Sequence, residues 1–399
     1  MTTTSAAATE PAAEPGTTRG SARGSGASPS RFSPANLFRT YGALIAIAVL
    51  AYLLLVWAPG TLTPFRLGNL GKYCCWAIAA VGIGLAWGRG GMLVMGQGVF
   101  FGLGGYIMAM HMKLEAAGPG EVPDFMSLYG NGTMPFWWEP FRSGTVTLIA
   151  IIVVPLLVSF LLGYAILKRG VKGAYFAILT QALAVAFATL LIATINETGG
   201  FNGLNSFRTF FGQKLNKDTK VDLYMMAAGF LILCLVVVWQ LYRSRFGELL
   251  VATRDAEARV RFLGYDPANT KLIAFVVAAV MASIGGALFT PIVGIISPSN
   301  VDAAASIMLL AGVALGGRAT LMGPAVGAIA VGYGQSTLSE SFPTTWTYFQ
   351  GALFIVVMLL LPGGFASLGT KLKGLFAGRS AASRESMATT PTVGAEAVA

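Results

Sequence analysis

The residues of this chain that could do chemistry are concentrated in one stretch, Tyr242–Pro267. Nine charged side chains lie there, although the whole chain of 399 residues carries only 27 Lys and Arg and 17 Asp and Glu. The stretch contains no HExxH, P-loop or Rossmann fingerprint, and neither does the rest of the chain. The single His and three Cys cannot build a His-based metal site, and the cysteines fall inside apolar runs. We therefore expect no catalytic residue, no metal and no cofactor bound by this chain.

The charged stretch has the pattern of an amphipathic helix over 247–263. Apolar residues recur at spacings of three and four between Leu249 and Leu263. Gly264 is expected to end the helix, and Pro267 to prevent its continuation. Such a helix is either a lever that docks on a soluble partner or a solvated helix on a membrane surface, and the pattern alone does not separate the two.

Two charge pairs are expected to stabilise that helix. Asp255 with Arg259 and Glu257 with Arg261 stand four positions apart, with the acid first. This order is the favoured one on a helix surface.

Composition places the rest of the chain in a membrane. The chain is 55% hydrophobic and 11% charged, with a mean hydropathy of +0.68, whereas soluble domains carry about 25% charged residues. The net charge of +10 does not indicate nucleic-acid binding, because the basic residues lie in short loops and form no stripe. Ten apolar segments stand out: 40–58, 71–88, 91–111, 145–167, 173–195, 223–242, 272–296, 303–317, 322–338 and 346–362.

These segments predict an all-α polytopic membrane protein with about ten transmembrane helices (about 8–10). Most Lys and Arg fall on one side when the segments alternate, and the positive-inside bias then places both termini in the cytoplasm, with Arg66 and Lys72 outside. The expected organisation is a disordered cytoplasmic tail over 1–36, a transmembrane domain over 37–373 with a cytoplasmic loop at 242–271, and a second disordered tail over 374–399.

Polar residues inside the apolar segments are neutral, which argues against a proton relay or a membrane-embedded enzyme. The set is Gln97, Ser159, Thr180, Gln181, Thr189, Thr194, Asn196, Ser283, Gln335 and Ser336. A small uncharged or zwitterionic solute suits such groups. The glycine-rich region 88–106 is the best candidate for a broken or re-entrant helix, because transporters interrupt helices at their binding sites.

Several motifs resemble the permeases of the branched-chain amino acid and urea ABC importer family. They are "VKGAYFAILTQALA" (171–184), "TGGFNGL" (198–204), "RSRFGELLVATRDAEARVRFLGYDP" (243–267), "ISPSNVDAAASIMLLAGVALGGRATLMGPAVGA" (296–328) and "LLPGGF" (360–365). They occur in the family's order over residues 70–365. The resemblance implies an inner-membrane, multi-pass permease subunit that works with a second permease, two cytoplasmic ATPases that use ATP, and an extracytoplasmic solute-binding protein.

The resemblance also assigns roles to residues. The loop 242–271 would dock on an ATPase, and the candidate coupling residues are Glu248, Arg254, Asp255, Arg259 and Gly264. Polarity and position within the motifs, taken together, give a candidate solute path that contains Gln97, Tyr106, Tyr175, Thr180 and Gln181.

Urea is the substrate expected from the sequence. Amino acid members of the family often have His where this chain has Gln97, and the segment "GQGVFFGLGGYIMAMHMKLEA" resembles the urea branch. Two alternatives stay open. The same machine could import branched-chain amino acids, or the chain could be a passive small-solute channel, which would work even with the charges between Arg254 and Arg261 scrambled.

Overall fold

The computed structural model describes residues 34–342 except 131 and 172, together with 345, 348–349, 351–352 and 355. Residues 1–42 and 43–399 form separate compact units, and the second unit is described here. The expected tail 374–399 lies outside the described residues, as do nearly all of 1–36 and most of the apolar segment 346–362.

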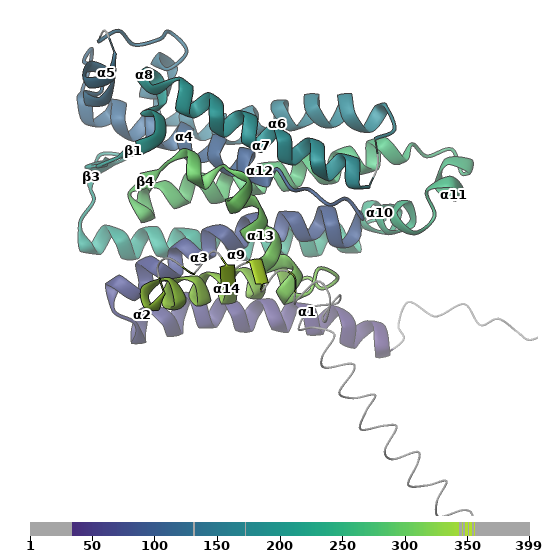
Figure 1. The fold of residues 1–399 in the computed structure, drawn as a ribbon. Helices are drawn as coiled ribbons and strands as arrows, with labels where there is room; N and C mark the ends of the chain where they lie inside the picture. The colour runs from purple at the N-terminus through teal and green to yellow at the C-terminus, as the bar shows by residue number, and fades with distance from the viewer. Residues whose placement is uncertain are drawn as a thin grey trace, which may run out of the picture. The chain divides into compact units, whose positions relative to one another are not determined.

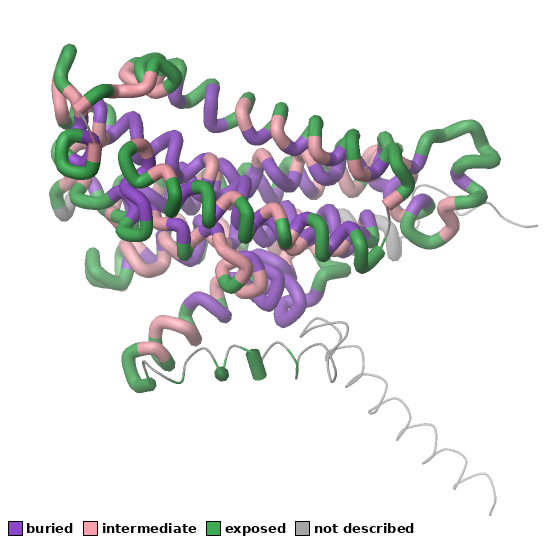
Figure 2. Tube along the Cα trace, turned by 45° about the horizontal axis from the view of Figure 1, so that its top comes forward, coloured by how far each residue is buried: buried purple, intermediate pink, exposed green. Residues whose placement is uncertain are grey.

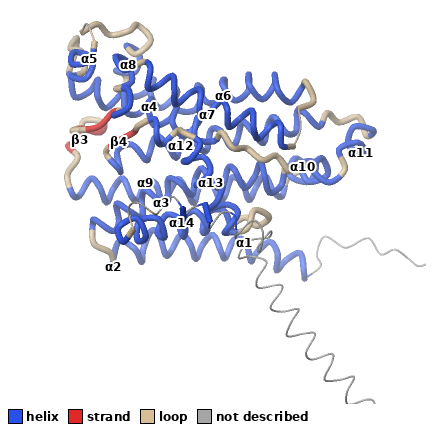
Figure 3. Tube along the Cα trace, in the orientation of Figure 1, coloured by secondary structure: helices blue, strands red, loops and turns tan. Residues whose placement is uncertain are grey.

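Helices make up almost all of the described chain (Figures 1 and 3). The long helices are α1 (Pro34–Tyr52), α3 (Pro64–Ile83), α4 (Gln97–Ala117), α6 (Gly144–Lys168), α7 (Ala174–Ala193), α9 (Lys217–Arg243), α12 (Pro267–Val293), α13 (Ala303–Gly316) and α14 (Gly323–Ser341). The short ones are α2 (Ala58–Thr61), α5 (Asp124–Tyr129), α8 (Ile195–Thr198), α10 (Arg245–Asp255) and α11 (Glu257–Phe262). Turns of π or 3-10 helix lie at η1 (Leu53–Trp57), η2 (Gly84–Arg89), η3 (Glu139–Arg142), η4 (Gly200–Asn202) and η5 (Pro298–Asn300).

In the part of the chain that the structure describes, four two-residue strands form two antiparallel pairs. β1 (Leu204–Asn205) pairs with β4 (Ile295–Ile296), with Leu204 opposite Ile296. β2 (Thr209–Phe210) pairs with β3 (Gln213–Lys214) in a small hairpin. The strands, α5 and α8 gather at one end of the long helices, and α10 and α11 lie at the opposite end (Figure 1).

Seven helical segments of the described chain are long and apolar enough to cross a membrane. They are Tyr41–Thr61, Pro64–Arg89, Gly144–Lys168, Ala174–Ala193, Thr219–Arg243, Pro267–Val293 and Pro298–Gly316. The sequence predicts about ten spans. The predicted segments 91–111 and 322–338 do form helices, α4 and α14, but neither is among the seven.

The centre of the second unit is formed by α3, α4 and α12, as the buried tube segments show (Figure 2). Phe101 on α4 packs edge-on against Phe289 on α12, with ring centroids 5.3 Å apart. Gly286 lies so close to α4 that a Cβ there would collide with the Phe101 carbonyl oxygen. Small residues permit this approach of two backbones. Cys74, Cys75 and Cys234 are buried free thiols, as expected.

Candidate functional site

The expected break in the region 88–106 is present. The π-helical turn η2 ends at Arg89, residues 91–96 are not helical, and α4 begins at Gln97. The Gln97 Nε2 donates to the Ala278 carbonyl oxygen at 2.6 Å. At about 1.5 Å per residue, Ala278 lies about 16 Å along α12 from Pro267, which is about half of a 30 Å hydrocarbon core. The first turn of α4 therefore lies deep inside the helical bundle.

Thr180 of α7 holds this break from one side. Its Oγ1 accepts from the Met95 backbone N–H at 3.2 Å and donates to the Ala177 carbonyl oxygen at 2.9 Å. Gly96 lies against the Thr180 backbone without room for a Cβ. The structure thus brings Thr180 next to the residue that precedes Gln97, so two of the predicted path residues lie at the same break.

A second interrupted element meets the break from the other side. The span Pro298–Gly316 consists of η5, a turn and α13, and the 14 residues of α13 measure only about 21 Å. The Gly98 N–H donates to Ser306 Oγ at 3.1 Å. Asp302 caps α13 by accepting from the Ala303 N–H at 2.6 Å. Two helix N-termini therefore lie close together inside the unit.

The remaining predicted path residues are divided between interior and surface. The Tyr106 hydroxyl and the Gln181 Oε1 are buried and have no hydrogen-bond partner in the described chain. Tyr175, in contrast, is 78% exposed on α7. The structure does not bring Tyr175 together with Gln97 and Thr180, and its predicted place in the path stays a prediction.

Replacing Gln97 with leucine tests its predicted role. The change keeps the side-chain volume and removes both the bond to Ala278 and the unpartnered Oε1. We expect solute uptake to fall about tenfold while the amount of assembled protein is unchanged. Gln240→Leu, at an exposed position of α9, is the matched control. Normal uptake by the Gln97→Leu protein would remove Gln97 from the path.

The charged stretch forms two helices, not the single helix expected over 247–263. α10 ends at Asp255, and Ala256 has φ −149° and ψ 65°, which breaks the helix before α11. The expected pair Asp255–Arg259 is therefore wrong, because the break separates its members, and Asp255 instead binds Arg254 at 2.7 Å. The expected pair Glu257–Arg261 is present at 3.5 Å.

Glycine ends α11 as expected. Gly264 has φ +86°, and its N–H donates to the Arg261 carbonyl oxygen at 3.0 Å. Such left-handed residues commonly close a helix. Pro267, however, starts α12 immediately afterwards. Glu248 and Arg259 are exposed, and neither forms an ion pair in the described part of the chain.

Two carboxylates at this end are held in the charged form. The hydrogen bond from Arg254 lowers the pKa of Asp255, and the hydrogen bond from Lys168 lowers the pKa of Asp266. A lowered folded-state pKa means that the contact stabilises the fold above the unfolded-state pKa. That contribution is lost as the pH falls through the lowered value. Both contacts are therefore present at neutral pH.

Arg254 connects α10 to the break before α4. Its Nη1 donates to the Gly88 carbonyl oxygen at 2.7 Å. A Cβ on Gly91, which has φ +66°, would lie 2.6 Å from the Arg254 Cγ. Gly88 also lies against the Arg318 backbone without room for a Cβ. The α10 helix is thus fastened directly to the residues from which segment 91–96 departs.

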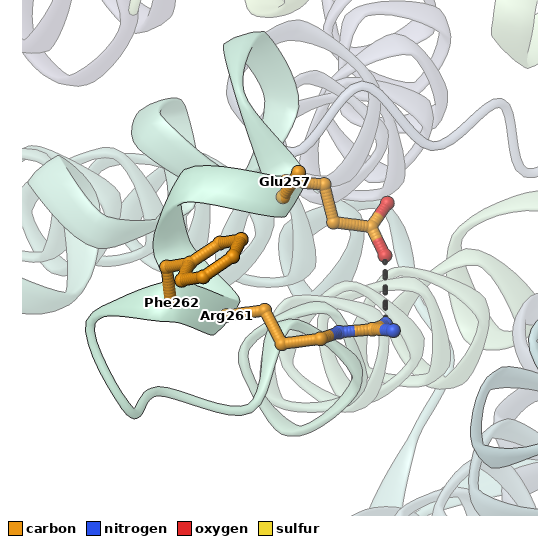
Figure 4. Close-up of a pocket in the computed structure, with 4 residues that line it drawn as sticks. Glu257, Arg261 and Phe262 are labelled. Carbon is orange, nitrogen blue, oxygen red and sulfur yellow. Dashed lines mark ion pairs between the residues drawn. The ribbon is translucent and has the colours of Figure 1, made fainter.

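An apolar tip lies exposed beside these charges. Phe262 is 94% exposed and Leu263 is 75% exposed. A pocket of about 390 Å³ opens beside Phe262 and is also lined by Glu257, Ala258 and Arg261. The ion pair between Glu257 and Arg261 forms one wall of it (Figure 4). This end therefore presents an apolar side chain next to fixed charges, the arrangement that protein interfaces use.

A second pocket, partly open to the surface, was not anticipated from the sequence. It has a volume of about 250 Å³ and lies between α3, α4, η5, α13 and α14. Trp76 forms part of its wall, and the Lys72 Nζ lies 4.7 Å from the centre of the Trp76 ring. The orientation argument places Lys72 in an outer loop, but the structure places it inside the candidate span Pro64–Arg89. Its spacing of four residues from Trp76 was the available signal.

Seven candidate spans in the described chain, together with a helix that is broken inside the bundle, are typical of a multi-pass membrane transporter. The chain belongs to the family of branched-chain amino acid transport system permease components, whose family model matches residues 66–359. Membership of this family confirms the expected membrane localisation, and it agrees with the expectation that the chain is not an enzyme.

Two groups of curated relatives are similar to this chain. The high-affinity branched-chain amino acid transport system permease protein LivM of Salmonella typhimurium and that of Escherichia coli are each 28% identical over 310 residues. The match covers 72% of this chain and 66% of each relative, just under two thirds of their length. The autoinducer 2 import system permease protein LsrC of Yersinia pestis is 26% identical over 217 residues, 50% of this chain and 60% of the relative. No solved structure matches.

Proposed function

We propose that this chain is the membrane-spanning permease subunit of an ATP-driven importer. A second permease, two cytoplasmic ATPases and an extracytoplasmic solute-binding protein complete the machine. Family membership supports the role. The observation that carries the mechanism is the bond from Arg254 to Gly88, because it joins an exposed docking end to the interior break.

In the proposed mechanism, motion passes from the docking end of the bundle to the solute path. An ATPase groove takes up the apolar tip at Phe262 and Leu263, and movement of the ATPase displaces α10. Arg254 passes that displacement to Gly88 and Gly91, and hence to segment 91–96. A change in that segment alters the environment of Gln97 and Thr180, so that the path opens to one side or the other.

Branched-chain amino acids are the first candidate substrate. LivM, the relative with the longer match, is named for them, so the comparisons favour this alternative over the urea expected from the sequence. The structure adds a physical reason. A zwitterion needs fixed charge or helix dipoles near its path, and Lys72 and the N-termini of α4 and α13 lie within the unit.

Urea is the second candidate. The observation that favours it is the set of unpartnered, buried amide oxygens on Gln97, Gln181 and Gln335. Urea is uncharged and offers several N–H donors to such acceptors. The resemblance of the α4 segment to the urea branch points the same way.

Uptake of labelled leucine and labelled urea at micromolar concentration, in nitrogen-starved cells with and without the gene, tests this function. Loss of leucine uptake alone assigns branched-chain amino acids, and loss of urea uptake alone assigns urea. Loss of neither, with the gene expressed, contradicts both candidates. Uptake that continues when ATP is depleted would make the chain a passive channel.

A further inference from the structure

The pocket of about 250 Å³, which is partly open at the exposed residues Ser299 and Ala304, has the chemistry of a solute-binding site. The residues that give it this character are Trp76, Phe101, Asn300, Met308, Leu309 and Gln335. They come from five elements spread between α3 and α14. The pocket therefore exists only when the helices are assembled, and no local sequence pattern marks it.

The polar groups of the pocket are complementary to one kind of ligand. The Gln335 Oε1 is buried and has no partner in the described chain, so it needs a donor. The Asn300 Oδ1 accepts from the Ser297 N–H at 3.0 Å, which fixes the amide and leaves its Nδ2 group to donate. A ligand that carries both an N–H donor and an oxygen acceptor satisfies both side chains.

The apolar wall of the pocket and the nearby Lys72 ammonium restrict the class of ligand further. Trp76 and Phe101 supply aromatic surface, and Met308 and Leu309 supply aliphatic surface. The Lys72 ammonium lies over the Trp76 ring, and no acidic side chain in the described chain forms an ion pair with it. A carboxylate or a carbonyl oxygen at the edge of Trp76 would be attracted to this charge.

The pocket also lies next to the first turn of α4, which moves in the proposed mechanism. Asn300 belongs to η5, and the next residue, Val301, lies against Gly98 and Gly102 of α4 without room for a Cβ on either glycine. A displacement of the first turn of α4 therefore reaches the pocket wall through one residue. The contact between Val301 and α4 thus connects the pocket with the helix that follows the break at 91–96.

We propose that this pocket binds the transported solute, a small amino acid with an apolar side chain. Its N–H group bonds to Gln335, its oxygen atoms face Asn300 and Lys72, and its side chain lies against Trp76 and Met308. The proposal rests on the proposed import function. Urea shares the N–H and carbonyl chemistry but lacks the apolar part, so the two solutes are separated by their dependence on Trp76.

Site-directed labelling in the complete importer tests the pocket directly. Ala305 lines the pocket, and Ala305→Cys is a small change, while the three native cysteines are buried. We expect millimolar leucine to slow maleimide labelling of this cysteine several-fold. Gln335→Leu should remove the protection, and Gln240→Leu should keep it. Trp76→Ala should weaken protection by leucine more than protection by urea.

The outcomes separate this proposal from the function on which it rests. If the unmodified importer takes up neither solute, the proposed function fails. If it takes up leucine or urea but neither solute protects Ala305→Cys, or if Gln335→Leu keeps full protection, the pocket is not the solute site. Protection by urea alone, unaffected by Trp76→Ala, would overturn the amino acid assignment and keep the pocket.

Discussion

Replacing Arg254 with methionine is expected to separate ATP hydrolysis from solute uptake. The change removes the bond to the Gly88 carbonyl oxygen and the bonds to Asp255 while keeping an unbranched apolar stem. Hydrogen bonds to charged groups contribute about 1.5–3 kcal/mol when buried, and less here because the side chain is 37% exposed. We expect uptake to fall about tenfold, with the ATPases still bound and active.

The measurement is uptake per ATP hydrolysed, in proteoliposomes that contain the purified importer. Arg245→Met is the matched control, because Arg245 lies on the same helix, is exposed and does not contact Gly88. Gly91→Ala disturbs the same contact between α10 and the break from the other side. The φ of +66° at Gly91 disfavours a side chain, and the new Cβ would lie against Arg254. An unchanged ratio of uptake to hydrolysis in both variants would show that the link does not transmit motion.

Loss of ATPase binding is expected from a change in the docking surface, and not from loss of the contact between Arg254 and Gly88. Phe262→Ala removes the most exposed large side chain of the apolar tip, and it should weaken copurification of the ATPases. Comparing the two variants distinguishes docking from transmission. Arg254→Met that also loses the ATPases would place Arg254 in the docking surface, as the sequence resemblance implies.

The second large effect is expected at Gly286. Valine at this position would drive its side chain into the Phe101 backbone of α4, and Gly104 of α4 lies equally close to the Ser283 backbone of α12, so the two helices are in backbone contact at more than one point. Overpacking of a well-packed core costs about 1–3 kcal/mol when side chains can adjust, and here the obstacle is backbone. We expect little monodisperse protein after detergent extraction.

Gly229→Val is the control for this experiment. Gly229 lies in the long helix α9, and nothing lies within 4 Å of a Cβ built there. We expect its yield in size-exclusion chromatography to match that of the unmodified protein. Equal yields for Gly286→Val and Gly229→Val would contradict the close packing of α4 on α12.

Local pattern was sufficient for features that depend on neighbouring residues in the chain. The glycine density of 88–106 predicts the break before α4, and the Gly264 signal predicts the left-handed residue after α11. The Glu257–Arg261 pair follows from helical spacing alone. In each case the residues that decide the structure lie within a few positions of one another.

Features that depend on tertiary packing were missed. Alanine favours helix, so nothing at Ala256 signals the separation of α10 from α11. Arg254 reaches a carbonyl group at Gly88, far away in the sequence. Tyr175 lies in a motif shared with Thr180, but the helix turns it outward. Periodicity identifies a helix, not which neighbours it will meet.

The number of candidate spans shows the same limit of reasoning from local sequence. Helix α4 is not among the seven segments apolar enough to cross a membrane, yet sixteen of its residues are buried. A helix that is enclosed by other helices has no need of a lipid-facing surface, so it tolerates glycine and polar residues. Hydropathy therefore misses α4, although it identifies the other two central helices, α3 and α12.

The pairing of β1 with β4 connects the loop after α8 with the pocket. It ties Leu204, in the loop after α8, to Ile296, only a few residues before Asn300. A displacement of that loop would therefore reach the pocket wall at Asn300 from the end of the bundle opposite to α10 and Arg254.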